Sequence, residues 1–228
     1  MSFSFDFCSY IWQVEILLFP MNVEMIGRRV VIVGGGEVAE RKARRFVESE
    51  AEVTVIAPKI TAGIMELLAA KKLCVFERKY EAGDLAGAFA VIVATDDAAI
   101  NAVVKKEAAE QGSLVNDAAG GESDFSVPAH FRRGKFLLTV STGDISPAMS
   151  RAVRQKLEEE FPPAFGEWLE VLNGIRSEMK GQLKTPKERQ SFWRAALDER
   201  VLDLVRAGDI AQAEVILRHA ANNYGAKS

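Results

Sequence analysis

Three consecutive glycines follow a short apolar run at residues 30–36, VVIVGGG, and the chain then continues into a segment of helical composition. Gly34, Gly36 and Ala39 match the spacing G-x-G-x-x-G/A. In this pattern the first glycine permits a tight turn off a strand, the second lets the backbone approach a pyrophosphate, and the third small residue allows close helix packing. The helix N-terminus adds free N–H groups and a partial positive charge. The pattern indicates dinucleotide binding; the alternative is a structural turn without a ligand.

The segment after the next apolar run, EVTVIAP at 52–58, lacks a residue that dinucleotide sites often have. An acidic side chain commonly ends the second strand and binds the ribose 2′-hydroxyl. Here the residues are Ala57, Pro58 and Lys59. Two interpretations of Lys59 stay open: a contact to a 2′-phosphate, or a solvated loop lysine. A further alternative is that backbone groups at Ala57 and Pro58 hold the ribose.

Polar residues also end the run FAVIVAT at 89–95 and follow it. Ligands of open α/β sheets bind outside the carboxyl ends of the strands. Thr95 and Asp96 are therefore expected to meet the ribose or the nicotinamide half of a dinucleotide. Helix capping by Asp96 or Asp97 is the alternative, and both roles are compatible.

The run SLVND at 113–117 ends in Asn116 and Asp117. Both residues are expected at the edge formed by the carboxyl ends of the strands. A carboxylate beside a dinucleotide is placed to act as a general base, taking a proton while a hydride leaves to the cofactor. Asp124 is the competing carboxylate. Turn formation is the alternative for both, because Asp, Asn and Gly all favour loops.

A second loop-to-helix junction lies at residues 140–154, VSTGDISPAMSRAVR. It carries hydroxyls at Ser141, Thr142 and Ser146, and Arg151 and Arg154 follow on the expected helix. A helix N-terminus of this kind favours an anion. A capped structural helix with solvated arginines is the alternative.

The elements that must position these residues alternate between strands and helices over the first half of the chain. Strands are predicted at 29–33, 52–58, 73–79, 89–95 and 113–117, and helices at 37–49, 61–71 and 98–111. Alternation without hairpin signals implies right-handed crossovers and a parallel sheet. The strands are near-continuous apolar runs, as a sheet covered on both faces requires. The predicted fold is a doubly wound, Rossmann-type α/β domain.

The pattern changes after residue 117. A glycine-rich loop at 117–124 precedes one more predicted strand at 135–142, entered through the turn RRG at 132–134. From Ser146 onward the chain has a helical pattern, with about four helices expected. Ser146 and Pro147 suit the first positions of a helix. The prolines at 162 and 163 are expected to stop that helix, and Thr185 with Glu188 forms a capping box.

Composition excludes several classes of protein. Of the 228 residues 48% are hydrophobic and 27% charged, and the net charge of −3 gives no basic field for nucleic acid. Cys8 and Cys74 are too few for a disulfide framework or a zinc site, which favours a reducing compartment. Cys74 is expected to be buried in its strand. His130 and His219 have no metal-ligand spacing, and the basic run ERKARR at 40–45 is interpreted as a solvated helix face.

The first twenty residues, MSFSFDFCSYIWQVEILLFP, are apolar and aromatic. Asp6 and Glu15 interrupt the run, no basic residue precedes it and no small-residue cleavage site follows. Neither a signal peptide nor a membrane span is expected, and the chain is predicted to be cytoplasmic.

Together these segments resemble one family, the NAD-dependent precorrin-2 dehydrogenases, also found as the N-terminal part of siroheme synthases. The matching stretches run in the family's order over roughly residues 17–175: LFPMNVEMIGRRVVIVGGGEVAERKA (18–43), VTVIAP (53–58), VIVATDDAAIN (91–101), DFSVPA (124–129) and VSTGDISPAMSRAVRQKLE (140–158). The combination of GGGEVAERK, ATDD and STGDISP is far more specific than a glycine motif alone. The family also usually lacks the acid after the second strand.

The resemblance implies oxidation of precorrin-2 to sirohydrochlorin in siroheme biosynthesis, with NAD as hydride acceptor. Some members also insert ferrous iron into the product. It further implies a homodimer with its active site between the Rossmann and the helical parts. The expected organisation is an unexplained extension at 1–16, an NAD-binding Rossmann domain at 17–117, a dimerisation or linker region at 118–145 and a helical C-terminal domain at 146–228. No membrane and no nucleic acid are expected as partners.

The resemblance also assigns site residues. The cofactor-binding positions of the family map onto Gly36, Glu37, Val38, Pro58, Lys59, Thr95 and Asp96, and the motif adds Gly34. The family's catalytic aspartate follows the fifth strand, where VNDAAGG makes Asp117 the best match and Asp124 the alternative. Because the substrate carries many carboxylates, we expect its binding residues among the hydroxyls and cations of the second junction: Ser141, Thr142, Ser146, Arg151 and Arg154, with Arg132, Arg133 and Lys135 nearby.

Two other classes of function stay open. A regulatory domain that only senses NAD requires the glycine loop. It does not require the STGDISP segment or a second carboxylate. A chelatase with a degenerate dehydrogenase site is a third interpretation, against which the intact glycine loop argues.

Overall fold

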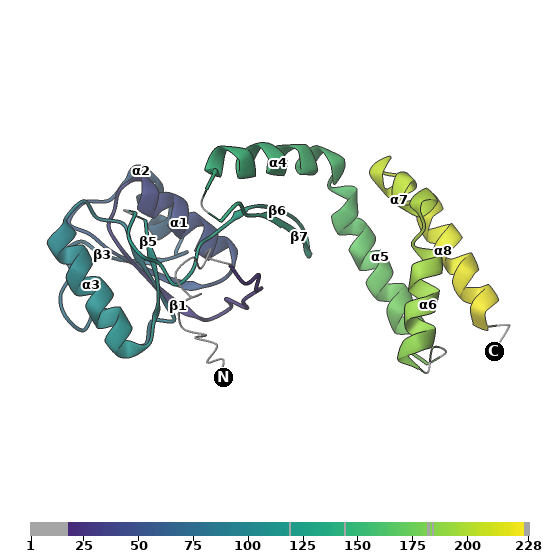
Figure 1. Cartoon of the computed structure of the whole chain (residues 1–228), viewed down its shortest axis with the longest axis horizontal. Helices are drawn as coiled ribbons and strands as arrows, with labels where there is room; N and C mark the ends of the chain where they lie inside the picture. Colours follow the sequence, from purple (N-terminus) through teal and green to yellow (C-terminus); the bar gives the residue numbers. More distant parts are fainter. Residues whose placement is uncertain (1–17, 119, 144, 182, 184, 226–228) are drawn as a thin grey trace, which may run out of the picture. The chain divides into compact units, whose positions relative to one another are not determined.

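The structure is a computed structural model that describes residues 18–118, 120–143, 145–181, 183 and 185–225 (Figure 1). The extension expected at residues 1–16, with Cys8, lies outside the described residues. The chain forms two compact units, one comprising Phe19–Val127 and the other containing the chain from Pro128 onward. The domain boundaries expected near residues 117 and 145 stay predictions.

A five-stranded parallel sheet in the order β3-β2-β1-β4-β5 forms the centre of the first unit. Its elements, in chain order, are β1 (Arg29–Val33), α1 (Glu37–Glu48), β2 (Glu52–Ile56), α2 (Ala62–Ala69), β3 (Cys74–Phe76), β4 (Ala90–Val93), α3 (Ala98–Gln111) and β5 (Leu114–Asp117). This confirms the predicted doubly wound α/β fold.

Both faces of the sheet are covered, because alternate side chains of its strands enter different cores. In β1, Val30 and Ile32 pack in a cluster with Ala39 and Ala43 of α1. Val31 and Val33 instead share a cluster with Val104 and Ala108 of α3, where side chains of β4 and β5 also pack. Period-two alternation in an all-apolar strand requires this arrangement. It directs neighbouring residues of one strand toward different helices.

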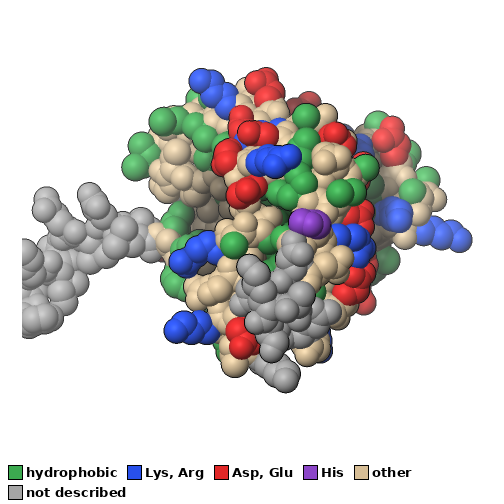
Figure 2. Space-filling model, turned by 90° about the vertical axis from the view of Figure 1, so that its right-hand side faces the viewer, with side chains coloured by type: hydrophobic (Ala, Val, Ile, Leu, Met, Phe, Trp, Pro, Cys, Tyr) green, Lys and Arg blue, Asp and Glu red, His purple; other side chains and the backbone are tan. Residues whose placement is uncertain are grey.

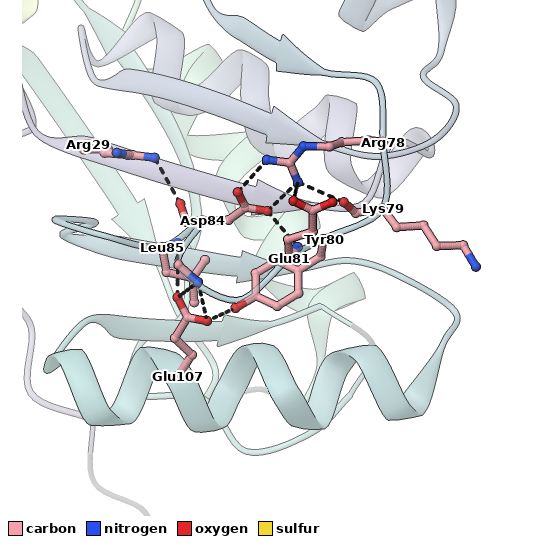
Figure 3. A network of polar contacts seen from close by, with 9 residues as sticks. Arg29, Arg78, Lys79, Tyr80, Glu81, Asp84, Leu85 and Glu107 are labelled. Atoms are coloured by element: carbon pink, nitrogen blue, oxygen red, sulfur yellow. Dashed lines mark hydrogen bonds and ion pairs between the residues drawn. The ribbon is translucent and has the colours of Figure 1, made fainter.

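The crossover from β3 to β4, residues 77–89, contains turns rather than a helix (Figure 3). Glu107 of α3 anchors it by accepting hydrogen bonds from the Tyr80 hydroxyl and from the backbone N–H groups of Gly83 and Leu85. Asp84 pairs with Arg78 at 2.7 Å. Burial, together with the Glu107 carboxylate, raises the pKa of Tyr80 well above its usual range.

The expectation that Cys74 is buried is wrong, because its side chain is exposed. Strand β3 has only three residues and lies at the edge of the sheet. The side chain of Phe76, two residues further on, is also 47% exposed. The strand predicted at 73–79 is therefore shorter than expected, and no helix was predicted between it and the strand expected at 89–95.

The second unit begins with a two-stranded antiparallel hairpin, β6 (Ala129–Arg133) and β7 (Phe136–Val140). Only the second of these strands was predicted, and the RRG segment assigned to a turn is partly strand. Arg132 and Arg133 belong to β6, and the turn is formed by Gly134, at a φ of 57°, with Lys135.

Five helices follow in the described part of this unit: α4 (Pro147–Glu160), α5 (Ala164–Met179), α6 (Pro186–Ala196), α7 (Glu199–Arg206) and α8 (Ile210–Gly225). The predicted caps at Ser146 and Thr185 are present, the second as a complete capping box. The count exceeds the expected four because Asp198 caps a new helix by accepting from Val201 N at 3.0 Å.

The core of this unit lies between α5, α6, α7 and α8 and includes Trp168, Phe192, Val205 and Leu217. Its surface carries charges of both signs. Figure 2 shows acidic and basic side chains interspersed on one face, without an extended patch of a single sign. Arg218, for example, pairs with both Glu178 and Glu214.

Candidate dinucleotide site

Gly34 forms the tight turn at the carboxyl end of β1, and only glycine fits there. Its φ is +128°, and its N–H donates to the Ile56 carbonyl at 2.9 Å. A Cβ at this position would lie 2.2 Å from the carbonyl oxygen of Ala94. A Cβ on Gly35 would lie 2.0 Å from the carbonyl oxygen of Lys59. The glycine loop is therefore closely packed between the segment that follows β4 and the segment that follows β2.

Gly36 differs from its two neighbours because it is open to solvent. Its φ is −81°, and an added Cβ would meet nothing within 4 Å. It is the N-cap of α1, and no side chain of its own caps the first-turn N–H groups. Free N–H groups with an open approach and the positive end of a helix dipole are what a pyrophosphate requires. The residues present thus fit a dinucleotide phosphate.

The first turn of α1 is exposed on one side and packed on the other. Glu37 and Val38 are exposed, whereas Ala39 is fully buried against the sheet. The Glu40 carboxylate accepts hydrogen bonds from the Thr61 hydroxyl and from Arg44. The hydrogen bond from the Thr61 hydroxyl, at 2.7 Å, and the Arg44 guanidinium hold the pKa of the Glu40 carboxyl below its usual value.

The segment after β2 lies directly beside the glycine loop. Thr61 N donates to the Gly35 carbonyl at 3.1 Å, and Ala57 is buried. Pro58 and Lys59 are both exposed. The structure therefore brings the Lys59 backbone next to the phosphate loop and leaves its ammonium in solvent, which fits either interpretation of this lysine.

Thr95 and Asp96 follow β4, but their side chains have different environments. The Thr95 hydroxyl donates to Asn101 Oδ1 at 2.5 Å and accepts from Asp97 N at 3.1 Å. Asp97, rather than Asp96, caps α3 by accepting from the N–H groups of Ala99 and Ile100. Asp96 is exposed. The Thr95 hydroxyl is thus used within the protein, whereas the Asp96 side chain is open to solvent.

Asp117 ends β5 in the same register row as Val93 of β4 and Val33 of β1. It therefore lies two strands, about 10 Å, from the strand that carries the glycine loop. Its side chain is only 4% exposed, and Oδ2 accepts from Lys105 Nζ at 2.8 Å. Its backbone N–H donates to the Ser123 hydroxyl at 2.9 Å. The structure thus provides one nearly buried carboxylate at the edge where a dinucleotide would lie.

Asp124 has a different place, since it closes the loop after β5. Its Oδ2 accepts from Val115 N at 2.8 Å, and its own N–H donates to the Val115 carbonyl at 2.8 Å. The residue is exposed, and the loop from 118 to 123 separates it from the strand end. One of its carboxylate oxygens is therefore already used to hold the backbone.

Two lysines near this edge were not singled out in the sequence. Lys42 belongs to the run interpreted as a solvated helix face, yet it is half-buried and donates to Asn116 Oδ1 at 2.8 Å. Lys105 of α3 pairs with Asp117. Helical spacing was the available signal. Lys42 follows Ala39 by three residues and precedes Phe46 by four, and both of these are buried.

The hydroxyls of the second junction form hydrogen bonds within the loop and with the first turn of α4. Thr142 Oγ1 lies 2.9 Å from Ser150 Oγ and accepts from Ser146 N at 3.2 Å. Ser146 Oγ accepts from Met149 N at 3.3 Å, and Ser141 Oγ from Gly143 N at 3.3 Å. Asp144 lies outside the described residues.

The cations near this junction divide into paired and exposed side chains. Arg133 and Arg154 both contact Glu158, and Lys135 lies 3.4 Å from Glu170. Arg151 is exposed on α4. Of the expected carboxylate binders on this helix, Arg151 is thus the more available to a ligand. Among the described residues no group of three or more His, Cys, Asp or Glu is arranged to hold a metal ion.

Comparison with known proteins agrees with this geometry. Residues 21–129 match the family model described as "Putative NAD(P)-binding", and residues 164–220 match the one described as the sirohaem synthase dimerisation region. That second match lies in α5–α8, whereas a dimerisation or linker region was expected at 118–145. The role of residues 118–145 stays a prediction.

Named relatives point the same way. The siroheme synthase of Photorhabdus laumondii is 34% identical over 196 residues, which cover 86% of this chain and 42% of that protein. The siroheme synthase of Methylococcus capsulatus is 35% identical over 204 residues, covering 89% and 43%. The chain thus spans less than half the length of these curated relatives. A solved structure named "SirC, precorrin-2 dehydrogenase" matches with a TM-score of 0.69 and 28% identity, covering 86% of this chain and 98% of that one.

The open glycine loop, the parallel sheet and the first matched region define an NAD(P)-binding Rossmann-type protein. With its helical second region, the chain belongs to the family formed by the N-terminal part of siroheme synthases, and it is similar to a solved precorrin-2 dehydrogenase. None of the helices in the described part of the chain is long and apolar enough to span a membrane.

Proposed function

We propose that this protein oxidises precorrin-2 to sirohydrochlorin in siroheme biosynthesis, using NAD as the hydride acceptor. One observation carries the proposal: the uncapped N-terminus of α1 at Gly36 lies at the same sheet edge as the nearly buried carboxylate of Asp117. A dinucleotide laid along this edge from the glycine loop extends toward that carboxylate. The names of the matched relatives agree with this reaction.

The cofactor would be held by residues at the ends of β1, β2 and β4. Gly34 shapes the loop, and N–H groups from Gly36, Glu37 and Val38 would bind the pyrophosphate. Pro58 and Lys59 would contact the adenosine ribose, and Thr95 and Asp96 would contact the other half of the dinucleotide. When bound, NAD supplies the electron acceptor, since its nicotinamide takes up two electrons and one proton as a hydride.

Asp117 is proposed as the general base. Oxidation of precorrin-2 removes a hydride and a proton, so the protein must supply a site for that proton. Asp117 is the carboxylate placed at the strand end, whereas Asp124 is tied to the backbone of Val115. Asp117 Oδ2 accepts a hydrogen bond from Lys105 Nζ, which holds the carboxylate at the strand end.

The substrate is a tetrapyrrole with many carboxylates, and we assign its binding to the junction before α4. Arg151 presents an exposed guanidinium, which matches a carboxylate in charge and geometry. Ser141, Thr142 and Ser146 shape the turn by their capping bonds. We propose that these three residues hold the loop in position around the substrate.

We further propose that the protein is a cytoplasmic homodimer. The match of residues 164–220 to a dimerisation region supports the dimer. The exposed free thiol of Cys74 suits a reducing compartment. Insertion of ferrous iron, as a second substrate, is a separate activity that iron-dependent loss of the sirohydrochlorin absorbance measures directly.

Kinetics of Asp117→Asn and Asp124→Asn test the assignment of the base. We expect Asp117→Asn to lower kcat by about 10²–10⁴-fold, because it removes the proton acceptor while keeping the shape of the side chain. NAD affinity should not change. A larger loss of kcat in Asp124→Asn than in Asp117→Asn would assign the base to Asp124.

A regulatory protein that senses NAD is the other class of function, and the same assay distinguishes it. Such a protein binds NAD with normal affinity and forms no NADH when precorrin-2 is supplied. The nearly buried carboxylate beside the cofactor edge favours the enzyme, because binding alone does not require it.

A further inference from the structure

The carboxyl end of β5 is held from both faces of the sheet at adjacent residues. Asn116 points toward the α1 face, where Lys42 Nζ donates to its Oδ1 at 2.8 Å. Asp117 points toward the α3 face, where Lys105 Nζ donates to its Oδ2 at 2.8 Å. The alternation of side chains along a strand produces this geometry. Two ammonium groups from two helices thus fix one strand end.

The Lys105–Asp117 pair is enclosed by the loop that follows β5. A Cβ added to Gly121 would lie 2.2 Å from Asp117 Oδ2 and 2.9 Å from Lys105 Nζ. Gly121 does not have a positive φ, so its backbone conformation alone does not require glycine. What requires glycine is the close approach of the loop to the ion pair.

The Asn116 contact extends to the same loop. Its Nδ2 donates to the Phe125 carbonyl at 2.8 Å, and the residue is only 6% exposed. Lys42 lies on α1, the helix whose N-terminus faces the proposed pyrophosphate. A hydrogen-bonded path therefore runs from the cofactor helix through Asn116 to the far end of the loop that covers Asp117.

We propose that Lys105 and Lys42 are positioning residues that hold the Asp117 carboxylate and its loop in place for proton transfer. The inference rests on the proposed function, since it assigns these lysines a role in the same reaction. Neither lysine need touch the substrate or the cofactor. Lys105 fixes the orientation of the carboxylate, and Lys42 fixes the strand end and the loop through Asn116.

The decisive experiment compares Lys105→Met with Lys106→Met. Lys106 is the next residue of α3, but its side chain is 78% exposed and lies 3.9 Å from Glu110. We expect Lys105→Met to lower kcat by about 10–100-fold, the loss that follows a small misplacement of a reacting group. The KM for NAD and the number of NAD sites should be unchanged. Lys105→Arg should restore most of kcat, and Lys106→Met should equal wild type.

Gly121→Ala gives an independent test if Lys105→Met is unstable. It changes no charged group and pushes Lys105 and Asp117 apart, so the same selective loss of kcat is expected. For the second lysine, Lys42→Met should lower kcat, and Arg41→Met, on the exposed side of α1, should not.

The possible failures are distinct. Wild-type kcat in both Lys105→Met and Gly121→Ala overturns the positioning role of Lys105 while the proposed function stands. Wild-type kcat in Lys42→Met overturns the role of Lys42. Absence of precorrin-2-dependent NADH formation in the wild-type protein, with NAD binding intact, overturns the proposed function instead.

Discussion

At the scale of single residues, the three glycines of one loop have separable roles. Gly34 and Gly35 are confined by neighbouring carbonyl oxygens at 2.2 and 2.0 Å from an added Cβ, whereas Gly36 faces open space. The first two therefore belong to the fold. Under the proposed function the third serves cofactor binding, because a side chain there would obstruct the approach of the pyrophosphate.

Substituting these glycines by alanine tests that separation. We expect Gly34→Ala to lower the free energy of unfolding by about 1–3 kcal/mol or more, because its φ of +128° and its contact with Ala94 both oppose a Cβ. Gly36→Ala should unfold like wild type but bind NAD at least about tenfold more weakly. Chemical denaturation and NAD titration measure the two effects. If Gly36→Ala bound NAD as tightly as wild type, the assignment of the phosphate-binding position to Gly36 would be wrong.

The residues predicted from sequence were those that a local motif defines. The spacing of Gly34, Gly36 and Ala39 lies within one turn and one helix, so it is visible in a single stretch of chain. The role of Lys105 could not be predicted in this way, because it depends on a contact with Asp117, which is twelve residues away and belongs to another element. Lys42 and Asn116 are 74 residues apart. Contacts of this kind depend on the sheet order, which no local motif contains.

At the scale of elements, the helix-free crossover from β3 to β4 depends on one carboxylate. Glu107 accepts from two backbone N–H groups and the Tyr80 hydroxyl (Figure 3). Its role is to satisfy donors that a helix would have satisfied internally.

Removing that carboxylate should loosen the crossover. We expect Glu107→Ala to lower the free energy of unfolding by about 1–3 kcal/mol, because it leaves these donors without their acceptor. The matched control is Glu110→Ala, one turn further along α3, where the side chain is 65% exposed. This control should change the stability by less than about 0.5 kcal/mol. Chemical denaturation measures both, and equal stabilities would contradict the role of Glu107.

The same unit should be sensitive to acid. Burial opposes the charge of Glu107, but its hydrogen bonds from Tyr80, Gly83 and Leu85 outweigh this and lower the pKa of the carboxyl. Arg78 lowers the pKa of Asp84. A carboxyl whose pKa is lower in the folded than in the unfolded state stabilises the fold above its unfolded pKa, and this stability is lost as the pH falls.

The free energy of unfolding should therefore decline as the pH drops below the ordinary values of 4.5 for Glu and 3.8 for Asp. The pH dependence of chemical denaturation measures this decline. Replacing Arg78 by Met should weaken it, since the pKa of Asp84 then returns toward its ordinary value. A stability that does not change through this range would show that these carboxylates do not contribute.

Elements with strong periodic or capping signals were predicted well, and those defined by their neighbours were not. The parallel strands and the caps at Ser146 and Thr185 are confirmed. Strand β6, AHFRR, has too many polar residues to stand out, and it exists because it pairs with β7. Cys74 is exposed in β3, a three-residue strand at the edge of the sheet, and that edge position is set by the strand order.

At the scale of the whole molecule, the proposed homodimer has a direct measurement. Light scattering on the full chain should give twice its mass of 25.0 kDa. This expectation rests on residues 164–220, which form helices and match a dimerisation region. A mass of one chain at concentrations used for catalysis would contradict the dimer. It would leave the glycine loop and Asp117, which lie in one unit of one chain, unaffected.

Under the proposed function, this protein transfers a hydride from precorrin-2 to NAD. The most direct measurement supplies precorrin-2 and NAD to the purified wild-type protein without oxygen, and follows NADH and sirohydrochlorin by their absorbance. We predict that the two products form together, in equal amounts, and only when protein and both substrates are present. If the protein bound NAD but formed no NADH from precorrin-2, the proposed hydride transfer would be contradicted.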